Sequence, residues 1–240
     1  LLEESRNNND SRSVTISHNN QKVSVIGDAY YGAWNIAHAI NSSLEVVKRN
    51  YPTYLFGGSF NPITKAHAKI IEYLSTLGSV IIVPNGDKYN LKDLMSFDHR
   101  KKMIELELNK MKYQERVTIS LFEKSTLYKG SIETLRYYNH PIMVIGDDCL
   151  LSLHNWINAE SLVKENNFLV ITRNHNKDDL VSYIEKQEIL KAYKDNFKVI
   201  ELLDEDTRQM SSTSYRSTNN QDVISLEVIK YIKNNNLYEV

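Results

Sequence analysis

From Tyr54 onward, the chain alternates short apolar segments with longer amphipathic ones, and this alternation is what most limits its fold. Strands are predicted at residues 54–56, 80–83, 117–120, 142–145, 168–172 and 199–202, and helices are predicted to begin near Ala66, Ser96, Ile132, Asp178 and Val223. Strands that each lead into a helix form a parallel sheet with helices on both faces. The sequence therefore predicts an α/β fold with a doubly wound parallel sheet, whose ligands bind beyond the carboxyl ends of the strands.

The first part of the chain has a different composition. Residues 1–22 are polar and rich in Asn and Ser, and such a segment buries too little apolar surface to fold, so a tail is predicted there. A short strand at residues 23–26 and a helix through Ile36, Ile40, Leu44 and Val47 are predicted to follow. Residues 1–52 are thus a polar tail plus a small strand-helix extension of unknown role, and residues 53–240 form one domain. The chain starts at Leu1 without an apolar leader, which is typical of a fragment.

Composition excludes several classes of partner and site. Lys and Arg number 29 against 30 for Asp and Glu, so no basic surface favours nucleic acid or an anionic membrane. The longest apolar runs are four residues, whereas a spanning helix needs about 20. A single cysteine, Cys149, excludes an internal disulfide and a thiolate zinc site, and fits a reducing compartment. We therefore expect a cytoplasmic protein that binds neither nucleic acid nor membrane.

The first candidate site follows the first strand, at residues 57–67 with the sequence GGSFNPITKAH. Gly57 and Gly58 let backbone N–H groups approach a ligand, and the helix that follows adds partial positive charge at its N-terminus. Thr64 and His67, three residues apart at the helix start, are expected to face the bound anion. Alternatively, Thr64 caps the helix and His67 is an ordinary first-turn residue. The segment predicts an anion-binding loop.

A second candidate site lies far downstream, at residues 211–216 with the sequence SSTSYR. Hydroxyl side chains at a helix start offer side-chain and backbone donors together, and Arg216 adds a fork of donors suited to phosphate. By itself the segment also reads as a Ser-rich helix cap. Together with the first loop, it predicts a second phosphate-binding element.

These two segments resemble motifs of the nicotinate/nicotinamide mononucleotide adenylyltransferase family. Residues 57–67 are similar to its G-G-x-F-x-P-x-[HT]-x-x-H motif, and residues 211–216 to its S-S-T-x-x-R motif. Between them, residues 146–148 (GDD) look like G-x-D, residues 171–173 (ITR) resemble V-T-R, and Trp156 stands where many members place an aromatic ring. Pro84, residues 92–94 (KDL) and residues 99–100 (HR) are similar to the segment that reaches over the bound nucleotides. The resemblance covers residues 54–240 and implies a Rossmann-like nucleotidyltransferase domain.

The resemblance implies transfer of an adenylyl group from ATP to nicotinate mononucleotide, giving nicotinate adenine dinucleotide and pyrophosphate in NAD biosynthesis. The residues that match catalytic positions are His67, Arg216 and Thr64. Those that match ATP-binding positions are Gly57, Gly58, Ser59, Phe60, Gly146, Asp148, Ser211, Ser212 and Thr213. Those expected to bind the mononucleotide are Trp156, Lys92, Thr134 and Arg173. Mg²⁺ is expected to arrive with ATP, without protein side chains as metal ligands. Family members often self-associate, so a homo-oligomer stays open.

Several of these side chains also have purely structural interpretations. Asp148 can be a solvated turn residue, and Lys92 a solvated loop residue. Trp156 can pack under a loop, and Arg173 can pair with a neighbouring carboxylate. His99 and Arg100, in the first turn of a helix capped by Ser96, suit structural roles as well as ligand contact. Cys149 is expected to be a buried spectator.

The choice of acceptor is open at this point. Thr64, Ala66 and Asn61 stand where the bacterial form usually has histidine, glycine and aspartate, which keeps nicotinamide mononucleotide as an alternative acceptor. The short spacing from Gly146 to Trp156 looks bacterial and favours nicotinate mononucleotide. Phosphopantetheine adenylyltransferase shares the opening motif, but Arg216 and Trp156 argue against it. A nucleotide-sensing module that has lost catalysis is the remaining alternative.

Overall fold

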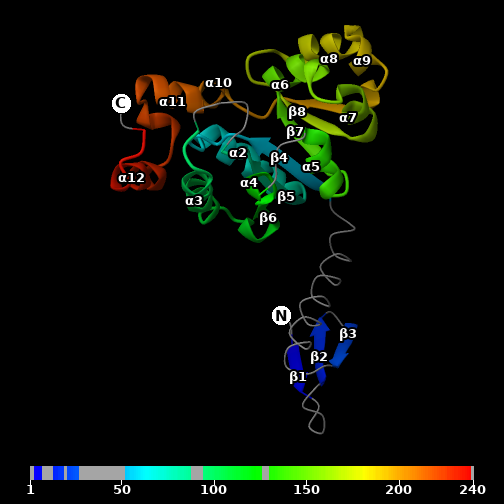
Figure 1. The fold of residues 1–240 in the computed structure, drawn as a ribbon, viewed down its shortest axis with the longest axis vertical. Helices are drawn as coiled ribbons and strands as arrows, with labels where there is room; N and C mark the ends of the chain where they lie inside the picture. Colours follow the sequence, from blue (N-terminus) through cyan, green and yellow to red (C-terminus); the bar gives the residue numbers. More distant parts are fainter. Residues whose placement is uncertain are drawn as a thin grey trace. The chain divides into compact units, whose positions relative to one another are not determined.

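The computed structural model describes residues 3–6, 13–18, 21–26, 52–87, 94–125 and 130–238. Contacts divide the chain into two units, Leu1–Tyr51 and Pro52–Val240, and each is described by itself (Figure 1). Among the described residues, every helix is too short or too polar to span a bilayer.

In the first unit, β1 (Glu3–Arg6), β2 (Ser13–His18) and β3 (Gln21–Ile26) form an antiparallel sheet in that order. The strand expected at residues 23–26 is therefore present in β3. The strands β1 and β2 correct the polar tail expected over residues 1–22. Alternation of apolar and polar residues explains the difference, since the register places Val14 opposite Val25 and Ile16 opposite Val23. The helix expected through Ile36 to Val47 lies outside the described residues.

The second unit contains a six-stranded sheet in the order β6-β5-β4-β7-β8-β9, in which every pair is parallel. The strands are β4 (Thr53–Gly58), β5 (Ser79–Pro84), β6 (Val117–Ile119), β7 (Ile142–Gly146), β8 (Phe168–Ile171) and β9 (Phe197–Ile200). The prediction of a doubly wound parallel sheet is confirmed. Strand β9 begins two residues before the expected segment because Phe197 pairs with Phe168 and the two rings stack, with 4.9 Å between centroids.

Helices cover both faces of this sheet (Figure 1). They are α2 (Lys65–Leu77), α3 (Phe97–Leu108), α4 (Phe122–Ser125), α5 (Ser131–Tyr137), α6 (Asp147–Ser152), α7 (Ala159–Glu165), α8 (Lys177–Lys186), α9 (Glu188–Lys191), α10 (Glu205–Arg208), α11 (Ser212–Thr218) and α12 (Leu226–Asn234). Sequence periodicity located the first residues of α2, α3, α5 and α8 to within one residue. The helix expected from Val223 begins at Leu226 instead, because Val223 closes a 3₁₀ turn and Ser225 caps α12. The shorter helices were missed.

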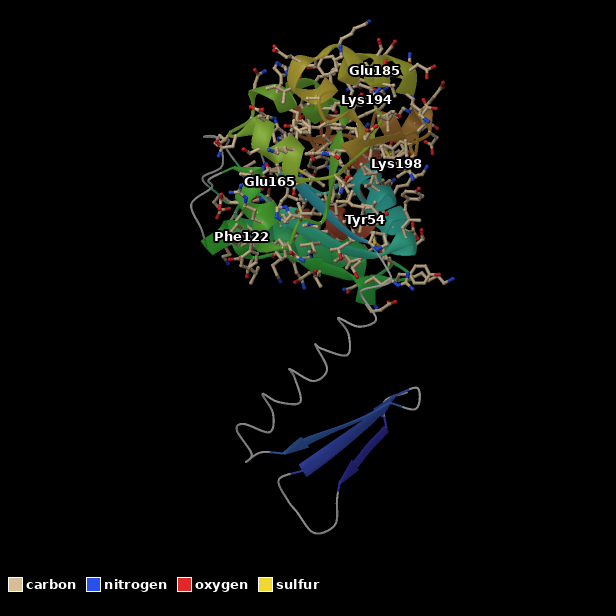
Figure 2. All side chains as sticks on the ribbon, turned by 90° about the vertical axis from the view of Figure 1, so that its right-hand side faces the viewer. Tyr54, Phe122, Glu165, Glu185, Lys194 and Lys198 are labelled. Atoms are coloured by element: carbon tan, nitrogen blue, oxygen red, sulfur yellow. The ribbon has the colours of Figure 1, made fainter. Side chains whose placement is uncertain are left out.

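Strand β4 is buried on both faces. Tyr54 and Phe56 pack in the core formed with α2, α3 and α12, whereas Leu55 packs in the core formed with α5, α6, α7 and α8. Figure 2 shows Tyr54 within the unit, whereas Glu185 belongs to its exposed outer surface. Burial on both faces is what keeps a parallel strand continuously apolar.

The strand order also determines where a ligand can bind. Counted from β4, the order is third, second, first, fourth, fifth, sixth, which is the order of Rossmann-like sheets. The chain winds one way from β4 to β6 and the other way from β7 to β9. A crevice opens at the carboxyl ends of β4 and β7, where the direction reverses.

Candidate active site

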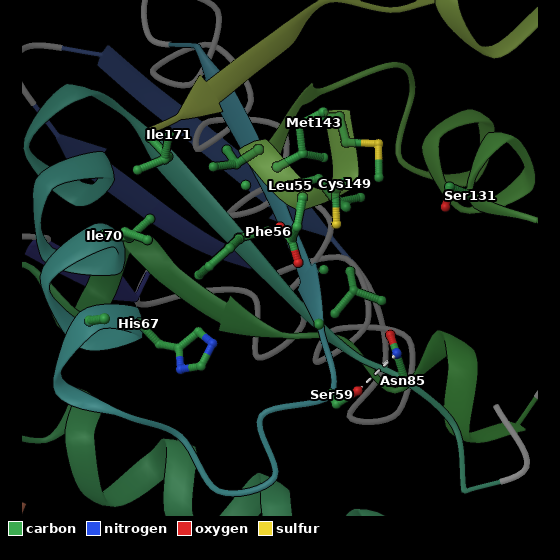
Figure 3. Close-up of a pocket in the computed structure, with 18 of the residues that line it drawn as sticks. Leu55, Phe56, Ser59, His67, Ile70, Asn85, Ser131, Met143, Cys149 and Ile171 are labelled. Atoms are coloured by element: carbon green, nitrogen blue, oxygen red, sulfur yellow. Dashed lines mark hydrogen bonds between the residues drawn. The ribbon is translucent and has the colours of Figure 1, made fainter. Parts of the chain in front are cut away.

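A pocket of about 310 Å³ lies at this reversal point (Figure 3). The end of β4 contributes Gly57, Gly58 and Ser59 to its wall, and the end of β7 contributes Gly146 and Asp148. Its volume falls in the range of small-molecule sites. Four further candidate residues also line it, namely His67, Thr134, Trp156 and Arg173.

The side chains of Thr64 and His67 interlock at the start of α2. The Thr64 N–H donates to His67 Nδ1 at 3.0 Å, the Thr64 hydroxyl lies 2.8 Å from the same nitrogen, and the His67 N–H donates back to Thr64 Oγ1 at 3.5 Å. This is a reciprocal cap of the helix N-terminus. Thr64 is 1% exposed and does not line the pocket, so the capping alternative describes its contacts. His67, by contrast, lines the pocket.

The cap also determines which nitrogen of His67 carries the proton. A backbone N–H can only donate, so Nδ1 accepts, and the proton of the neutral ring lies on Nε2. Burial, assisted by the positive charge of Arg173, lowers the pKa of His67 to about 4. The ring is therefore neutral at pH 7. His67 lines the pocket (Figure 3), and its ring has a single hydrogen-bond donor, Nε2–H.

The two motifs meet although about 150 residues separate them. Ser212 Oγ donates to the Pro62 carbonyl at 2.7 Å, and Arg216 Nη1 donates to the Asn61 carbonyl at 2.5 Å. The hydroxyl of Ser211 caps α11 by accepting from the Ser214 N–H at 2.9 Å, as the cap alternative expects. Helix α11 thus supports the loop between β4 and α2.

Besides Thr64, five described candidate residues do not line the pocket. They are Phe60, Ser211, Ser212, Thr213 and Arg216. Phe60 is buried and packs edge-on against His67, with 5.1 Å between ring centroids. Lys92, another candidate, lies outside the described residues.

Trp156, which lines the pocket, is half-buried, and its indole N–H donates to Ser152 Oγ at 3.3 Å. The buried hydroxyl of Thr134 donates to Glu123 Oε1 at 3.2 Å. Sequence reasoning missed Glu123, a buried pocket carboxyl whose Oε2 has no partner among the described residues. Burial raises the pKa of Glu123 to about 7. No spacing signal marks this residue, because it stands in a four-residue helix, α4.

Arg100 and His99 have structural contacts. The guanidinium of Arg100 is fully buried and donates to the carbonyls of Met95, Ser59 and Asn85 at 2.6, 3.0 and 2.7 Å, and to Asp87 Oδ1 at 2.9 Å. It therefore fixes the backbone of Ser59 at the pocket wall. His99 Nδ1 lies 2.8 Å from the Tyr231 hydroxyl. Neither side chain lines the pocket.

The two shifted pocket groups predict opposite dependences of stability on pH. The pKa of His67 is about 4 when folded and about 6.5 when unfolded, so its contribution is lost as pH falls through this window. The pKa of Glu123 is about 7 when folded and about 4.3 when unfolded, so its contribution is lost as pH rises through that window. Each shift changes the free energy of unfolding by up to about 3 kcal/mol, and the two changes have opposite signs between pH 4.5 and 6.5.

We expect His67→Asn to give a protein that becomes more stable, relative to wild type, as pH falls from 6.5 to 4. Glu123→Gln should become relatively more stable as pH rises from 4.5 to 7. Urea unfolding at several pH values measures both slopes. Parallel curves for wild type and either variant would contradict the corresponding shift.

Comparisons with known proteins agree with this geometry. A family model described as cytidylyltransferase-like matches residues 55–218. A probable nicotinate-nucleotide adenylyltransferase of Acholeplasma laidlawii is 34% identical over 197 residues, which cover 77% of this chain and 96% of that protein. Another from Caldicellulosiruptor bescii is 30% identical and covers 77% and 97%.

The fold is also similar to solved structures. The Plasmodium falciparum nicotinic acid mononucleotide adenylyltransferase complexed with NaAD superposes with a TM-score of 0.66 at 23% identity, covering 78% of this chain and 97% of that chain. At this identity the likeness shows the fold alone. The sequence matches show the family. The chain belongs to the cytidylyltransferase-like family and, within it, to the nicotinate-nucleotide adenylyltransferases.

Proposed function

We propose that this protein joins ATP to nicotinate mononucleotide, releasing pyrophosphate and nicotinate adenine dinucleotide. The observation that carries the proposal is the neutral His67 ring, whose Nε2–H faces a pocket at the reversal point of the sheet. Such a donor suits a phosphate oxygen, and the backbone of Gly58 and Ser59 lies beside it. Membership of the nicotinate-nucleotide adenylyltransferases supports the same reaction.

The reaction needs no covalent intermediate. A phosphate oxygen of the mononucleotide attacks the α-phosphorus of ATP, a new P–O bond forms, and the bond to the β-phosphate oxygen breaks to release pyrophosphate. The attacking oxygen is already anionic at neutral pH, so no general base is required. Positioning and charge stabilisation supply the rate.

The protein's task is then to hold two polyanions together. We propose that His67 donates to a phosphate of ATP, that Thr64 holds the ring of His67, and that Arg216 and residues 211–213 support the phosphate-binding loop and add positive charge beside it. Gly57, Gly58, Ser59, Phe60, Gly146 and Asp148 complete the ATP side. Trp156, Thr134, Arg173 and Lys92 are proposed for the mononucleotide side, where an aromatic plate suits a pyridinium ring.

An adenylyltransferase that uses ATP implies a divalent cation, and we propose Mg²⁺. The described residues contain no cluster of three or more His, Cys, Asp or Glu side chains that could hold a metal ion. We propose that the cation arrives on the ATP phosphates, where it offsets part of their charge. A cytoplasmic location, the lack of a nucleic-acid partner and self-association stay predictions.

The test is pyrophosphate release from ATP and Mg²⁺ by the purified protein, offered nicotinate mononucleotide, nicotinamide mononucleotide or phosphopantetheine in separate reactions. We expect a clear preference for nicotinate mononucleotide. Preference for the nicotinamide form would change the acceptor and keep the reaction. Turnover with phosphopantetheine alone, or ATP binding without turnover, would contradict the proposal.

A further inference from the structure

One buried carboxylate beside the pocket is not explained by the reaction. Asp147, the first residue of α6, is fully buried. Its Oδ2 accepts from three consecutive backbone N–H groups, those of Arg173, Asn174 and His175, at 3.2, 2.5 and 2.9 Å. His175 Nδ1 lies 3.1 Å from the same oxygen, and the Asp148 N–H donates to Oδ1 at 3.0 Å. Asp147 thus joins the end of β7 to the loop that follows β8.

The backbone N–H donors of this loop stabilise the ionised form of the Asp147 carboxylate. Burial by itself would raise the pKa of Asp147, but the donors of Asn174, His175 and Arg173 outweigh it and lower the pKa. Successive backbone N–H groups that converge on one point form an anion-binding concavity. Here a side chain of the protein fills that concavity, so the loop is held in one conformation.

The loop held in this way carries Arg173. Its backbone is bound by Asp147, and its side chain is bound separately, because Arg173 Nε donates to the Arg208 carbonyl at 2.8 Å. Arg173 lines the pocket, and its charge contributes to lowering the pKa of His67. The guanidinium therefore acts on the same region of the pocket as the Nε2–H donor.

We infer that Asp147 is a positioning residue, which fixes the loop Arg173–His175 so that the Arg173 guanidinium meets the nucleotide phosphates in the pocket. The inference rests on the proposed function. The residue does not touch the substrates and acts only through Arg173. A general stabilising effect of an acid at a helix N-terminus would act within α6 and would not require the three donors from the other loop.

A double-mutant cycle tests this coupling. Asp147→Ala and Arg173→Ala are each expected to lower kcat/KM by about 10- to 100-fold, because a phosphate-binding group is misplaced in one and removed in the other. In the double variant, Asp147→Ala should cost less than about 3-fold on top of Arg173→Ala. If Asp147→Ala costs the same factor in both backgrounds, or if Arg173→Ala leaves kcat/KM unchanged, the inference is wrong.

Two further variants separate positioning from loss of fold. Asp147→Asn keeps an oxygen for the three N–H groups but puts an amide nitrogen opposite the Asp148 N–H, so an intermediate loss in kcat/KM is expected. Asp179→Asn is the matched control, since this exposed carboxylate at the start of α8 bonds Asn176 and lies outside the cluster. It should stay within about 2-fold of wild type.

Amide hydrogen exchange of Asn174 and His175 should become faster in Asp147→Asn and stay unchanged in Asp179→Asn. Unchanged exchange in Asp147→Asn would overturn the inference, and this test remains available if Asp147→Ala does not fold. Should wild type show no turnover with any acceptor, the same cycle is measured by calorimetry with ATP and with nicotinate mononucleotide. Coupled losses of affinity would then support the role of Asp147 while the proposed reaction fails. Independent losses would overturn the inference.

Discussion

Replacing His67 by asparagine is expected to lower kcat by about 10²- to 10³-fold and to leave the melting temperature nearly unchanged. The asparagine side-chain oxygen lies where Nδ1 accepts from the Thr64 N–H, so the helix cap survives. The Nε2–H donor, which we place on a phosphate, is lost. Pyrophosphate release and thermal unfolding of the same preparation measure the two effects.

The matched variant is His67→Gln. Its side-chain amide nitrogen reaches the position of Nε2 but leaves Nδ1 without a replacement. We therefore expect it to retain more turnover than His67→Asn and to lose about 1 kcal/mol of stability through the weakened cap. Wild-type turnover in His67→Asn, or the same pattern in both variants, would contradict the assignment of the proton to Nε2.

Replacing Arg100 by methionine is expected to destabilise the protein by about 3 to 5 kcal/mol. The buried guanidinium satisfies three backbone carbonyls and Asp87, and a methionine of similar length satisfies none of them. For a domain of this size, the loss corresponds to a fall in melting temperature of roughly 6 to 20 °C. Urea unfolding measures the free energy directly.

The control for Arg100 is Arg136→Met, which removes the same charged group from an exposed site. Arg136 pairs with Glu165 and Glu133 on the surface, and such pairs contribute about 0 to 1 kcal/mol. Equal, small losses of unfolding free energy in the two variants would show that the hydrogen bonds of Arg100 do not stabilise the fold as its contacts indicate.

Periodicity was enough to predict the layers of the second unit. The central strands β4, β7 and β8 are buried on both faces and form short apolar runs, so their alternation with amphipathic helices implied the parallel order. Antiparallel pairing in the first unit was not predicted for β1 and β2, because the alternation of Val14 and Ile16 with polar residues is short and becomes evident only opposite the partner strand. Strand pairing is a tertiary property that composition does not carry.

The sequence predicted those parts of the candidate site in which the interacting residues are close together along the chain. Thr64 and His67 lie one helical turn apart, so both the capping and the anion-facing interpretations followed from spacing, and only the geometry separated their roles. The partners of Arg100 and Asp147 were not predicted, because they come from loops far along the chain. A charged residue next to a strand or helix end shows no sign of the distant backbone that it binds.

The long-range hydrogen bonds of Asn61 have a consequence for synthesis of the chain. Asn61 accepts from Arg216 through its carbonyl and from the Tyr238 hydroxyl through Oδ1, over separations of 155 and 177 residues. On the ribosome, the loop between β4 and α2 emerges early, whereas Arg216 and Tyr238 emerge 155 and 177 residues after Asn61. We therefore expect these two contacts of the loop to form only after the strands of the sheet have been translated, so that nucleotide binding follows assembly of the sheet.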